Sequence, residues 1–317
     1  MAHDHVKLPG NAEKVLEDLT KRAQEITDKA LLQFKMDPDL PILYHYTNDT
    51  GLHGILGSGK MWLSDIFSLN DPSELWHGVR IGFDVLFEKM VDAGKAQKKD
   101  RAAEFEDAKK HIEKSAQFLS CSFSKTGDDL GQWRAYAADG RGYAIGFDRS
   151  KLENVSKDIG SFLVSYEENE LRGVIEKICE CKLTEDERGR LISSLTCNEQ
   201  EYSFMKKLNG VIWSNILKLS LHYKHPAYKN EAEYRLLKIQ ETNVSDGIIK
   251  RPRNYRWIKY AELDWKSAGE DVLRKIVIGP AANFEKSKEF AEECLRRAGF
   301  DPARIEITQS DIPYQPA

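Results

Sequence analysis

The sequence lacks the features that mark membrane and secreted proteins. It contains no run of about eighteen apolar residues, and its first residues, MAHDHVKLPG, are polar where a signal peptide has an apolar core. Cysteine is scarce, with five residues among 317, and no two cysteines have C-x-x-C spacing. An odd number of cysteines without this spacing favours neither a disulfide framework nor a zinc ribbon. We therefore expect no membrane span, no metal and a cytoplasmic location.

The sequence also lacks the excess of positive charge that proteins binding duplex DNA carry. Its 47 Lys and Arg residues are outnumbered by 51 Asp and Glu residues, which gives a net charge of −4. The local exception is KRPRNYRWIKY, residues 250–260, where cations and aromatic residues are mixed. Such a mixture can bind single-stranded nucleic acid by stacking and charge, and it is also found in solvated strands and loops. Both explanations stay open.

Hydrophobic patterning predicts helices and strands in irregular order. Helices are expected over residues 11–35, 71–91, 98–116, 128–139, much of 170–222 and 283–298, and the main strands over 42–47, 61–65, 117–124, 231–239 and 255–263. This mixture favours the α+β class. We expect an N-terminal helical extension (1–40), one domain (41–280) with a helical insertion at about 170–222, and a β-α-β closing unit whose helix and last strand lie in 281–317.

Three strand-like segments carry candidate site residues. ILYHYTND (42–49) places one histidine, His45, in an apolar strand, either as a core residue with a hydrogen-bond partner or as a ligand contact. FLSCSFS (118–124) places Ser120, Ser122 and Ser124 on one strand face, where they either meet solvent or orient a neighbouring glutamate. EAEYR (231–235), interpreted as a strand, places Glu231, Glu233 and Arg235 on one face. That face is either an ion-pair ladder or a site that meets developing positive charge.

Together these segments resemble a known bacterial family. LYHYTN, MWLSDIFSLNDPSE, LSCSFSKTGDDLGQWRAYAADGRGYAIGF and NEAEYR follow the order and spacing of the family of unknown function numbered 2971 (DUF2971), over residues 41–280. That family is distantly similar to the ADP-ribosyltransferase superfamily. There a first-strand His or Arg contacts the adenosine-side ribose of NAD, a Ser-x-Ser or Tyr follows, and a late Glu-x-Glu contacts the nicotinamide ribose. The resemblance implies a split mixed or antiparallel sheet with flanking helices and a helical insertion.

The resemblance also implies a role for each site residue. Glu233 would stabilise an oxocarbenium-like ribose carbon, and Glu231 would orient or deprotonate the acceptor. Around NAD, His45 is expected at the distal ribose, with Tyr44 or Tyr46 packed beside it. The other expected contacts are Ser122 and Ser124 at Glu233 and the ribose, Trp133 or Tyr136 stacked on nicotinamide, and Arg134 or Arg141 at the pyrophosphate. These groups are expected to meet in one pocket sized for a dinucleotide. The sequence departs from the family pattern in combining His, Ser and Glu, and it has no tyrosine at the usual stacking position.

The function implied is cleavage of the nicotinamide–ribose bond of NAD, with transfer of ADP-ribose to a protein or nucleic acid, or to water. The resemblance further implies a role in phage defence or as a toxin, with an antitoxin or regulatory partner. One alternative is a non-catalytic module of the same fold that binds a nucleotide or a partner. Another is a metal-dependent nuclease using Asp65, Asp71, Glu74 and His77, although Asn-Asp-Pro-x-Glu is also explained by helix capping.

Overall fold

The computed structural model describes residues 6–32, 34, 40–68, 74–92, 94, 97–181, 183–241, 247–253 and 255–316. The chain divides into two compact units, each built from three separate segments. The helical unit comprises Met1–Phe34, Ser73–Lys109 and Ser165–Pro226. The sheet unit comprises Lys35–Pro72, Lys110–Val164 and Ala227–Ala317. The N-terminal helix and the expected insertion therefore belong to the same unit. The predicted domain boundaries instead treated residues 1–40 as a separate extension and residues 170–222 as an insertion in the main domain.

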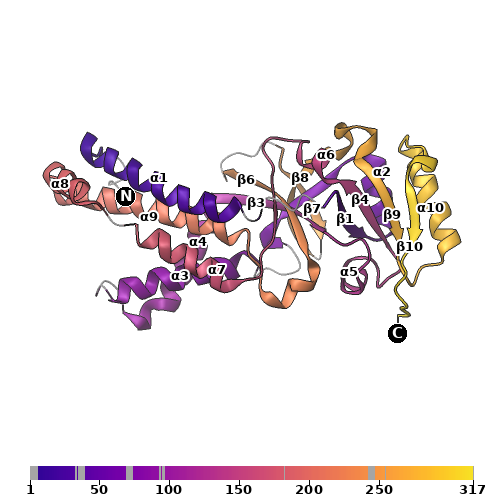
Figure 1. The fold of residues 1–317 in the computed structure, drawn as a ribbon, viewed down its shortest axis with the longest axis horizontal. Helices are drawn as coiled ribbons and strands as arrows, with labels where there is room; N and C mark the ends of the chain where they lie inside the picture. Colours follow the sequence, from indigo (N-terminus) through magenta and orange to yellow (C-terminus); the bar gives the residue numbers. More distant parts are fainter. Residues whose placement is uncertain are drawn as a thin grey trace. The chain divides into compact units, whose positions relative to one another are not determined.

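The helical unit is built from helices, several of them long (Figure 1). Its helices are α1 (Gly10–Leu32), α3 (Glu74–Asp92), α7 (Glu168–Cys179), α8 (Glu185–Ser194) and α9 (Asn198–Ser220). The next helix along the chain after α3 is α4 (Arg101–Ser115). In α1, Val15 and Leu19 are buried four residues apart and pack in a cluster with Phe204 of α9. The buried residues of α1, which also include Ala12, recur every three or four positions, so α1 has one apolar face and is part of a helical core. The expected helix start at Asp71 and Pro72 lies outside the described residues.

Among its described residues the sheet unit contains ten strands. They are β1 (Ile42–Thr47), β2 (Met61–Asp65), β3 (Ala116–Ser124), β4 (Tyr143–Asp148), β5 (Gly160–Leu163), β6 (Glu233–Glu241), β7 (Ile249–Arg253), β8 (Arg256–Leu263), β9 (Leu273–Ile278) and β10 (Glu306–Gln309). The main order is β10-β9-β4-β1-β3-β2-β8-β7, with β6 pairing to both β3 and β5. All of these pairs are antiparallel except β9 with β10, which the helix α10 (Phe284–Arg297) connects. The α+β class and the closing β-α-β unit are thus confirmed.

The sheet branches at β3. Along its whole length β3 pairs with β6, from Ala116 opposite Glu241 to Ser124 opposite Glu233. Its other edge pairs with β1 at Ser124 and with β2 at Ser120. Because neighbouring residues in antiparallel strands point to the same face, β3 fixes which side chains of β1 and β6 can meet.

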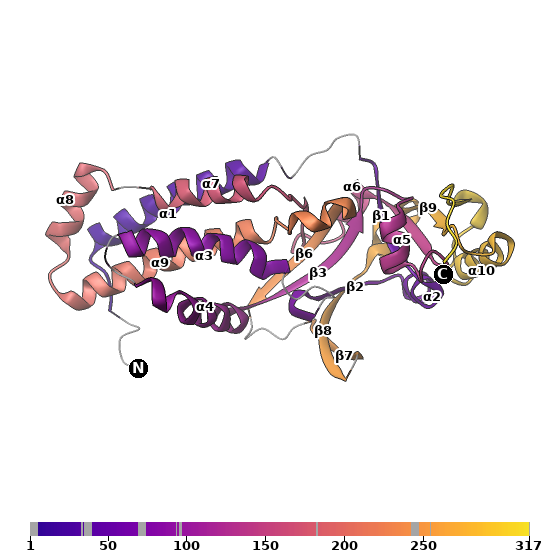
Figure 2. The same ribbon diagram turned by 90° about the horizontal axis from the view of Figure 1, so that it is seen from below.

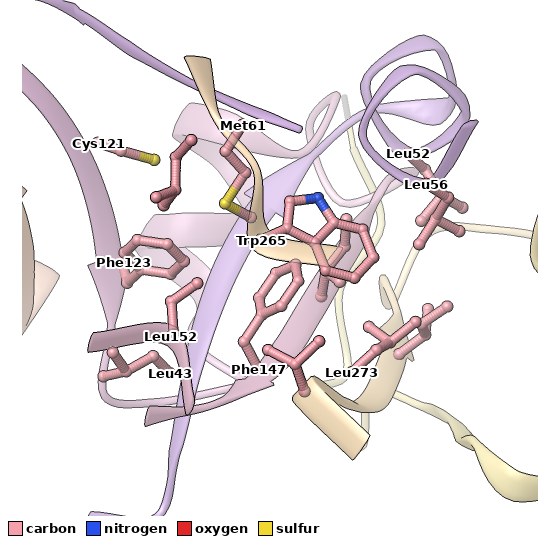
Figure 3. Packing of buried hydrophobic residues seen from close by; sticks show 14 of the residues in the cluster. Leu43, Leu52, Leu56, Met61, Cys121, Phe123, Phe147, Leu152, Trp265 and Leu273 are labelled. Carbon is pink, nitrogen blue, oxygen red and sulfur yellow. The ribbon is translucent and has the colours of Figure 1, made fainter. Parts of the chain in front are cut away.

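One face of this sheet is covered by an apolar core (Figure 3). Leu52 and Leu56 of α2 (Asp49–Ser58) contribute to it, and Trp265 packs edge-on against Phe147 of β4 at 5.2 Å between ring centroids. The helix α2 begins after Asn48, whose side chain accepts a hydrogen bond from the Gly51 amide. Burying one such leucine contributes about 1.5–3 kcal/mol, so this cluster is a main source of the unit's stability.

The opposite face carries α5 (Leu130–Tyr136), and the remaining helix of the unit is α6 (Arg149–Glu153). Asp129 caps α5 by accepting a hydrogen bond from the Gln132 amide. The cap holds α5 beside β1, where Trp133 reaches Tyr46. Within the described residues, the structure contains no helix with both the length and the apolar character that a membrane crossing needs.

Candidate active site

The strand β3 carries polar side chains on one face and apolar side chains on the other. Ser124 lies opposite Tyr44 of β1 and Glu233 of β6, and Ser122 lies opposite Arg235. Since side chains alternate along a strand, Ser122, Ser124 and Glu233 share one face. We call it the polar face of β3. Phe123 and Cys121 point to the other, apolar face.

His45 lies on the apolar face. Its ring packs edge-on against Phe123 at 5.7 Å, its Nδ1 lies 4.0 Å from the Cys121 sulfur, and the same nitrogen is 3.1 Å from the Ser122 carbonyl oxygen. Burial lowers the pKa of His45, and the Ser122 carbonyl offsets part of that effect. The prediction that His45 and Glu233 meet in one pocket is therefore wrong, because the sheet separates them.

Cys121 and His45 do not form a reactive thiol–imidazole pair. Burial, and to a lesser degree the charge of Glu233, raise the pKa of the Cys121 thiol to about 12. A thiol with so high a pKa is protonated at neutral pH and a poor nucleophile. The neighbouring imidazole is neutral for the same physical reason, so the pair is a feature of the core.

Glu233 forms a buried ion pair on the polar face. The Arg235 guanidinium donates from Nε to Oε1 at 2.8 Å and from Nη2 to Oε2 at 3.0 Å, and both side chains are at most 3% exposed. The Ser122 hydroxyl also donates to Oε1 at 2.6 Å, so the expected contact between Ser122 and Glu233 is present. A carboxylate that is buried and matched in charge is poorly placed to stabilise a cation on a substrate. This arrangement speaks against Glu233 as the principal catalytic carboxylate.

Glu231 does not extend the same strand. It ends the 3-10 helix η3 (Pro226–Glu231), and Ala232, which follows, has φ 45, in the left-handed region. This turn reverses the backbone before β6 begins at Glu233. The expectation that Glu231 and Glu233 share one strand face is therefore wrong.

The turn brings the Glu231 side chain to α5. Tyr136 of α5 donates from its hydroxyl to Glu231 Oε1 at 2.9 Å. The Glu231 backbone carbonyl accepts hydrogen bonds from the Ser124 hydroxyl at 3.1 Å and from Gln132 Nε2 at 3.4 Å. Glu231 is thus held from both its side chain and its backbone, while its side chain remains half-buried.

Glu231 lines a pocket of about 190 Å³ between α5 and η3. The lining residues are Asp129, Gly131, Gln132, Ala135, Tyr136, Ala227, Tyr228, Asn230 and Glu231. Pockets for drug-sized ligands span about 300–1,000 Å³, so this one matches a single ring system of a nucleotide and not a whole dinucleotide. It combines two carboxylates, two side-chain amides and two phenol rings, which suits the recognition of a polar ring.

Two aromatic residues expected to contact NAD are core residues instead. Trp133 is 0% exposed and donates from Nε1 to Asp128 Oδ1 at 2.6 Å. The Tyr46 hydroxyl donates to the Thr126 carbonyl at 2.8 Å and accepts from the Asp129 amide at 3.1 Å. The Trp133 ring of α5 packs on the Tyr46 ring of β1, with 4.8 Å between ring centroids. Both rings therefore join α5 to the sheet, which corrects their expected roles as NAD contacts. Tyr136, in contrast, is 39% exposed at the pocket.

The pocket also contains residues that the motifs do not single out. Gln132, Tyr228 and Asn230 line it, and the last two belong to η3, a segment without a strong periodic pattern. Arg134 lies on the exposed side of α5 and does not line this pocket. Its predicted contact with a pyrophosphate remains a prediction.

The residues of the nuclease alternative do not assemble in the described part of the chain. The Asp65 carboxylate accepts from the Phe67 amide at 3.4 Å and from the Ser68 hydroxyl at 3.3 Å, as in a turn cap. His77 lies 3.0 Å from Glu168 in the helical unit, while Asp71 and the side chain of Glu74 lie outside the described residues. Among the described side chains, no group of three potential ligands is placed to hold a metal.

Comparison with known proteins gives a family and no activity. No curated protein and no solved structure gave a significant match to the chain. The model of one family, described as a protein of unknown function (DUF2971), matches residues 132–236. The matched segment runs from Gln132 of α5 to Leu236 of β6 and so includes Tyr136, Glu231 and Glu233. Over these residues, about a third of the chain, the predicted resemblance to DUF2971 is confirmed.

Proposed function

We propose that the chain cleaves the nicotinamide–ribose bond of NAD and transfers the ADP-ribosyl group to a macromolecular acceptor, a protein or a nucleic acid. The observation that carries this proposal is the Glu231 carboxylate, held by Tyr136 in a pocket of single-ring size. The finer fold assignment, to the ADP-ribosyltransferase type, belongs to the same proposal. It is supported by the chain order of the Ser-x-Ser and Glu-x-Glu motifs and by the hydrogen bond from Ser122 to Glu233.

In this proposal Glu231 takes the role first expected of Glu233. As the bond from ribose to nicotinamide breaks, its electron pair leaves with the ring, which becomes neutral without receiving a proton. The ribose carbon becomes oxocarbenium-like, and the Glu231 carboxylate stabilises this charge more in the transition state than in the ground state. The acceptor then forms a bond to that carbon and gives its proton to Glu231. Water as acceptor gives NAD hydrolysis by the same steps.

The other residues position Glu231 and the nicotinamide. Tyr136 fixes the orientation of the carboxylate by donating a hydrogen bond to Oε1. Ser124 and Gln132 hold the Glu231 backbone. The exposed Tyr136 ring or the Tyr228 ring provides a surface on which nicotinamide can stack. Glu233 and Arg235 form the rigid base from which β6 starts. The resemblance extends the proposal to a cytoplasmic role in phage defence or as a toxin, with an antitoxin as a further partner.

The test is nicotinamide release from NAD labelled in the nicotinamide ring, with lysate protein, RNA, DNA or water as acceptor. Glu231→Gln is expected to lower the rate by about 10²–10³-fold, the size seen when one group that stabilises developing charge is removed. Glu289→Gln, at an exposed position of α10, is the matched control and should match the wild type. The proposal fails if the wild type releases no nicotinamide with any acceptor, or if Glu231→Gln releases it at the wild-type rate.

A nucleotide-binding module without turnover is the second candidate. The engagement of Glu233 by Arg235, together with the position of His45 on the apolar face, favours it over a complete catalytic set. Calorimetric titration with NAD separates the two candidates. Saturable binding that Glu231→Gln weakens, without nicotinamide release, identifies the binding module.

A further inference from the structure

The antiparallel hairpin of β7 and β8 concentrates positive charge at the edge of the sheet. It contains five cations, Lys250, Arg251, Arg253, Arg256 and Lys259, and the sequence has no acidic residue from Gly247 to Ala261. The strand β7 is the last in the main strand order, and Figure 2 shows it on the far side of β8 from the rest of the sheet. The hairpin differs in charge from the chain as a whole, whose net charge is −4.

Two pairs of like charges lie directly opposite each other in this hairpin. Lys250 pairs with Lys259, and Arg253 pairs with Arg256. Like charges in directly opposed positions destabilise a sheet, so this arrangement costs folding stability. A polyanion placed along the hairpin would remove that repulsion. Positive residues on an edge strand also discourage aggregation, as does Pro252, but that role does not require opposed pairs.

The same hairpin exposes large aromatic side chains. Tyr255, between the two strands, and Trp257 of β8 are 109% and 70% exposed. Exposed aromatic rings would promote aggregation, so protection of the edge does not explain them. They are the groups on which unpaired bases stack. The combination of stacking rings and cations favours single strands over a duplex, whose bases are already stacked.

A third aromatic residue holds an arginine in place. The Arg251 guanidinium lies over the Trp62 ring at 4.6 Å, and Trp62 in turn packs against Tyr260 at 4.9 Å. The Nε of Arg251 is buried and has no hydrogen-bond partner among the described residues. Burial, together with the neighbouring Arg253, lowers the pKa of Arg251. An anionic oxygen would provide the acceptor and the charge that this site lacks.

From these observations we propose that the hairpin of β7 and β8, with Trp62 of β2, is a binding surface for single-stranded nucleic acid. Because side chains alternate along a strand, Lys250, Lys259 and Trp257 lie on one face of the hairpin and Arg251, Arg253 and Arg256 on the other. The nucleic acid therefore passes around the edge strand β7, with phosphates at the opposed cation pairs and unpaired bases stacked on Trp257 and Tyr255. Recognition is by charge and stacking, so it has little sequence preference. The surface does not depend on the NAD-cleaving proposal, because it involves none of the residues that line the Glu231 pocket.

Fluorescence anisotropy of the full chain with labelled single-stranded DNA and RNA of about 20 nucleotides tests this surface. Trp257→Ala is expected to weaken binding about 5- to 150-fold, as for the loss of one stacked base. Its matched control is Tyr202→Ala on α9, a ring 63% exposed.

Replacing Lys250 and Lys259 by Gln should reduce the slope of log affinity against log salt by about 1.4, which is about 0.7 per phosphate contact. The matched control is the exposed pair Lys98 and Lys99.

Several results would overturn the proposal. The proposal fails if the single strands do not bind at about 50 mM salt. It also fails if the hairpin variants bind the single strands as tightly as their control variants do. Tighter binding of the matching duplex would assign the surface to duplex recognition instead. Equal binding to vesicles of anionic phospholipid would reduce it to a surface attracted to any polyanion. Circular dichroism of each variant confirms that the fold is kept. None of these outcomes affects nicotinamide release, so the two proposals fail separately.

Discussion

On the polar face of β3 the carboxylate of Glu233 is held by Arg235 and Ser122, whereas on the apolar face the imidazole of His45 lies against Phe123 and Cys121. Each face carries one ionisable group from a neighbouring strand, Glu233 fully buried and His45 half-buried, and the two groups differ in how their charge is compensated. A cation and a hydroxyl, from Arg235 and Ser122, compensate the carboxylate of Glu233. His45 is driven towards the neutral form because burial penalises its charge. The stability of the polar face therefore depends on an intact ion pair, and the stability of the apolar face depends on a neutral imidazole.

The largest expected effect comes from breaking the ion pair on the polar face. Glu233→Gln leaves the Arg235 charge buried without its carboxylate, which is expected to cost about 3–5 kcal/mol of unfolding free energy in urea titrations. The double variant Glu233→Leu, Arg235→Met removes both charges and should recover most of this loss, because apolar residues can replace a buried pair at little cost. A loss below about 1 kcal/mol in the single variant would mean that the pair contributes little to the polar face.

A smaller effect distinguishes two serines on that same face. Ser122 donates to Glu233, while the Ser120 hydroxyl is buried and has no hydrogen-bond partner among the described residues. Ser122→Ala is expected to cost about 1–2 kcal/mol, since it removes a hydrogen bond to a charged group. Ser120→Ala makes the same chemical change and should alter the unfolding free energy by less than about 0.5 kcal/mol, or raise it. Equal losses in the two variants would contradict the hydrogen-bond assignment.

The sequence predicted the polar face well because that face depends on local alternation. Strand periodicity alone puts Ser122 and Ser124 on one side of β3, and a strand that starts near Glu233 brings a carboxylate to them. The side of His45 depends on the pairing of β1 with β3, with Tyr44 opposite Ser124. A shift of that register by one residue would move His45 to the other face, and nothing in the sequence near His45 fixes it.

The sequence did not predict the position of Glu231, and the reason is different. The change of direction occurs at Ala232, whose φ of 45 has no sequence signature because alanine seldom adopts left-handed backbone. At the end of α2, by contrast, the residue with left-handed backbone is a glycine, Gly59, whose φ is 68, and glycine is the usual residue at such a helix end. The aromatic residues show a further limit of prediction from sequence. Tyr46 and Trp133 occur in two motifs whose rings could equally well contact a ligand or pack in a core. Only burial separates Trp133 from Tyr136, three residues later.

The smallest expected effect tests the apolar face, through the pH dependence of stability. The pKa of His45 is lowered in the folded chain, while in the unfolded chain it is about 6.5. Between these two values the unfolded chain binds more protons, so the unfolding free energy falls as the pH drops below about 6.5, by at most about 1.4 kcal/mol per pH unit. Above that pH, His45 contributes no slope. Urea titrations between about pH 5 and 8 measure this dependence.

Comparing variants isolates the His45 contribution from that of other titrating groups. His45→Gln is expected to flatten the acid slope, whereas His53→Gln, at an exposed position of α2, controls for the loss of any histidine. An unchanged slope in His45→Gln would mean that the imidazole accepts a proton as readily in the folded chain as in the unfolded one. His45 would then be open to water, and the apolar face of β3 could receive a ligand after all. A flattened slope leaves the polar face, and the Glu231 pocket beside it, as the side of the sheet from which a ligand can approach.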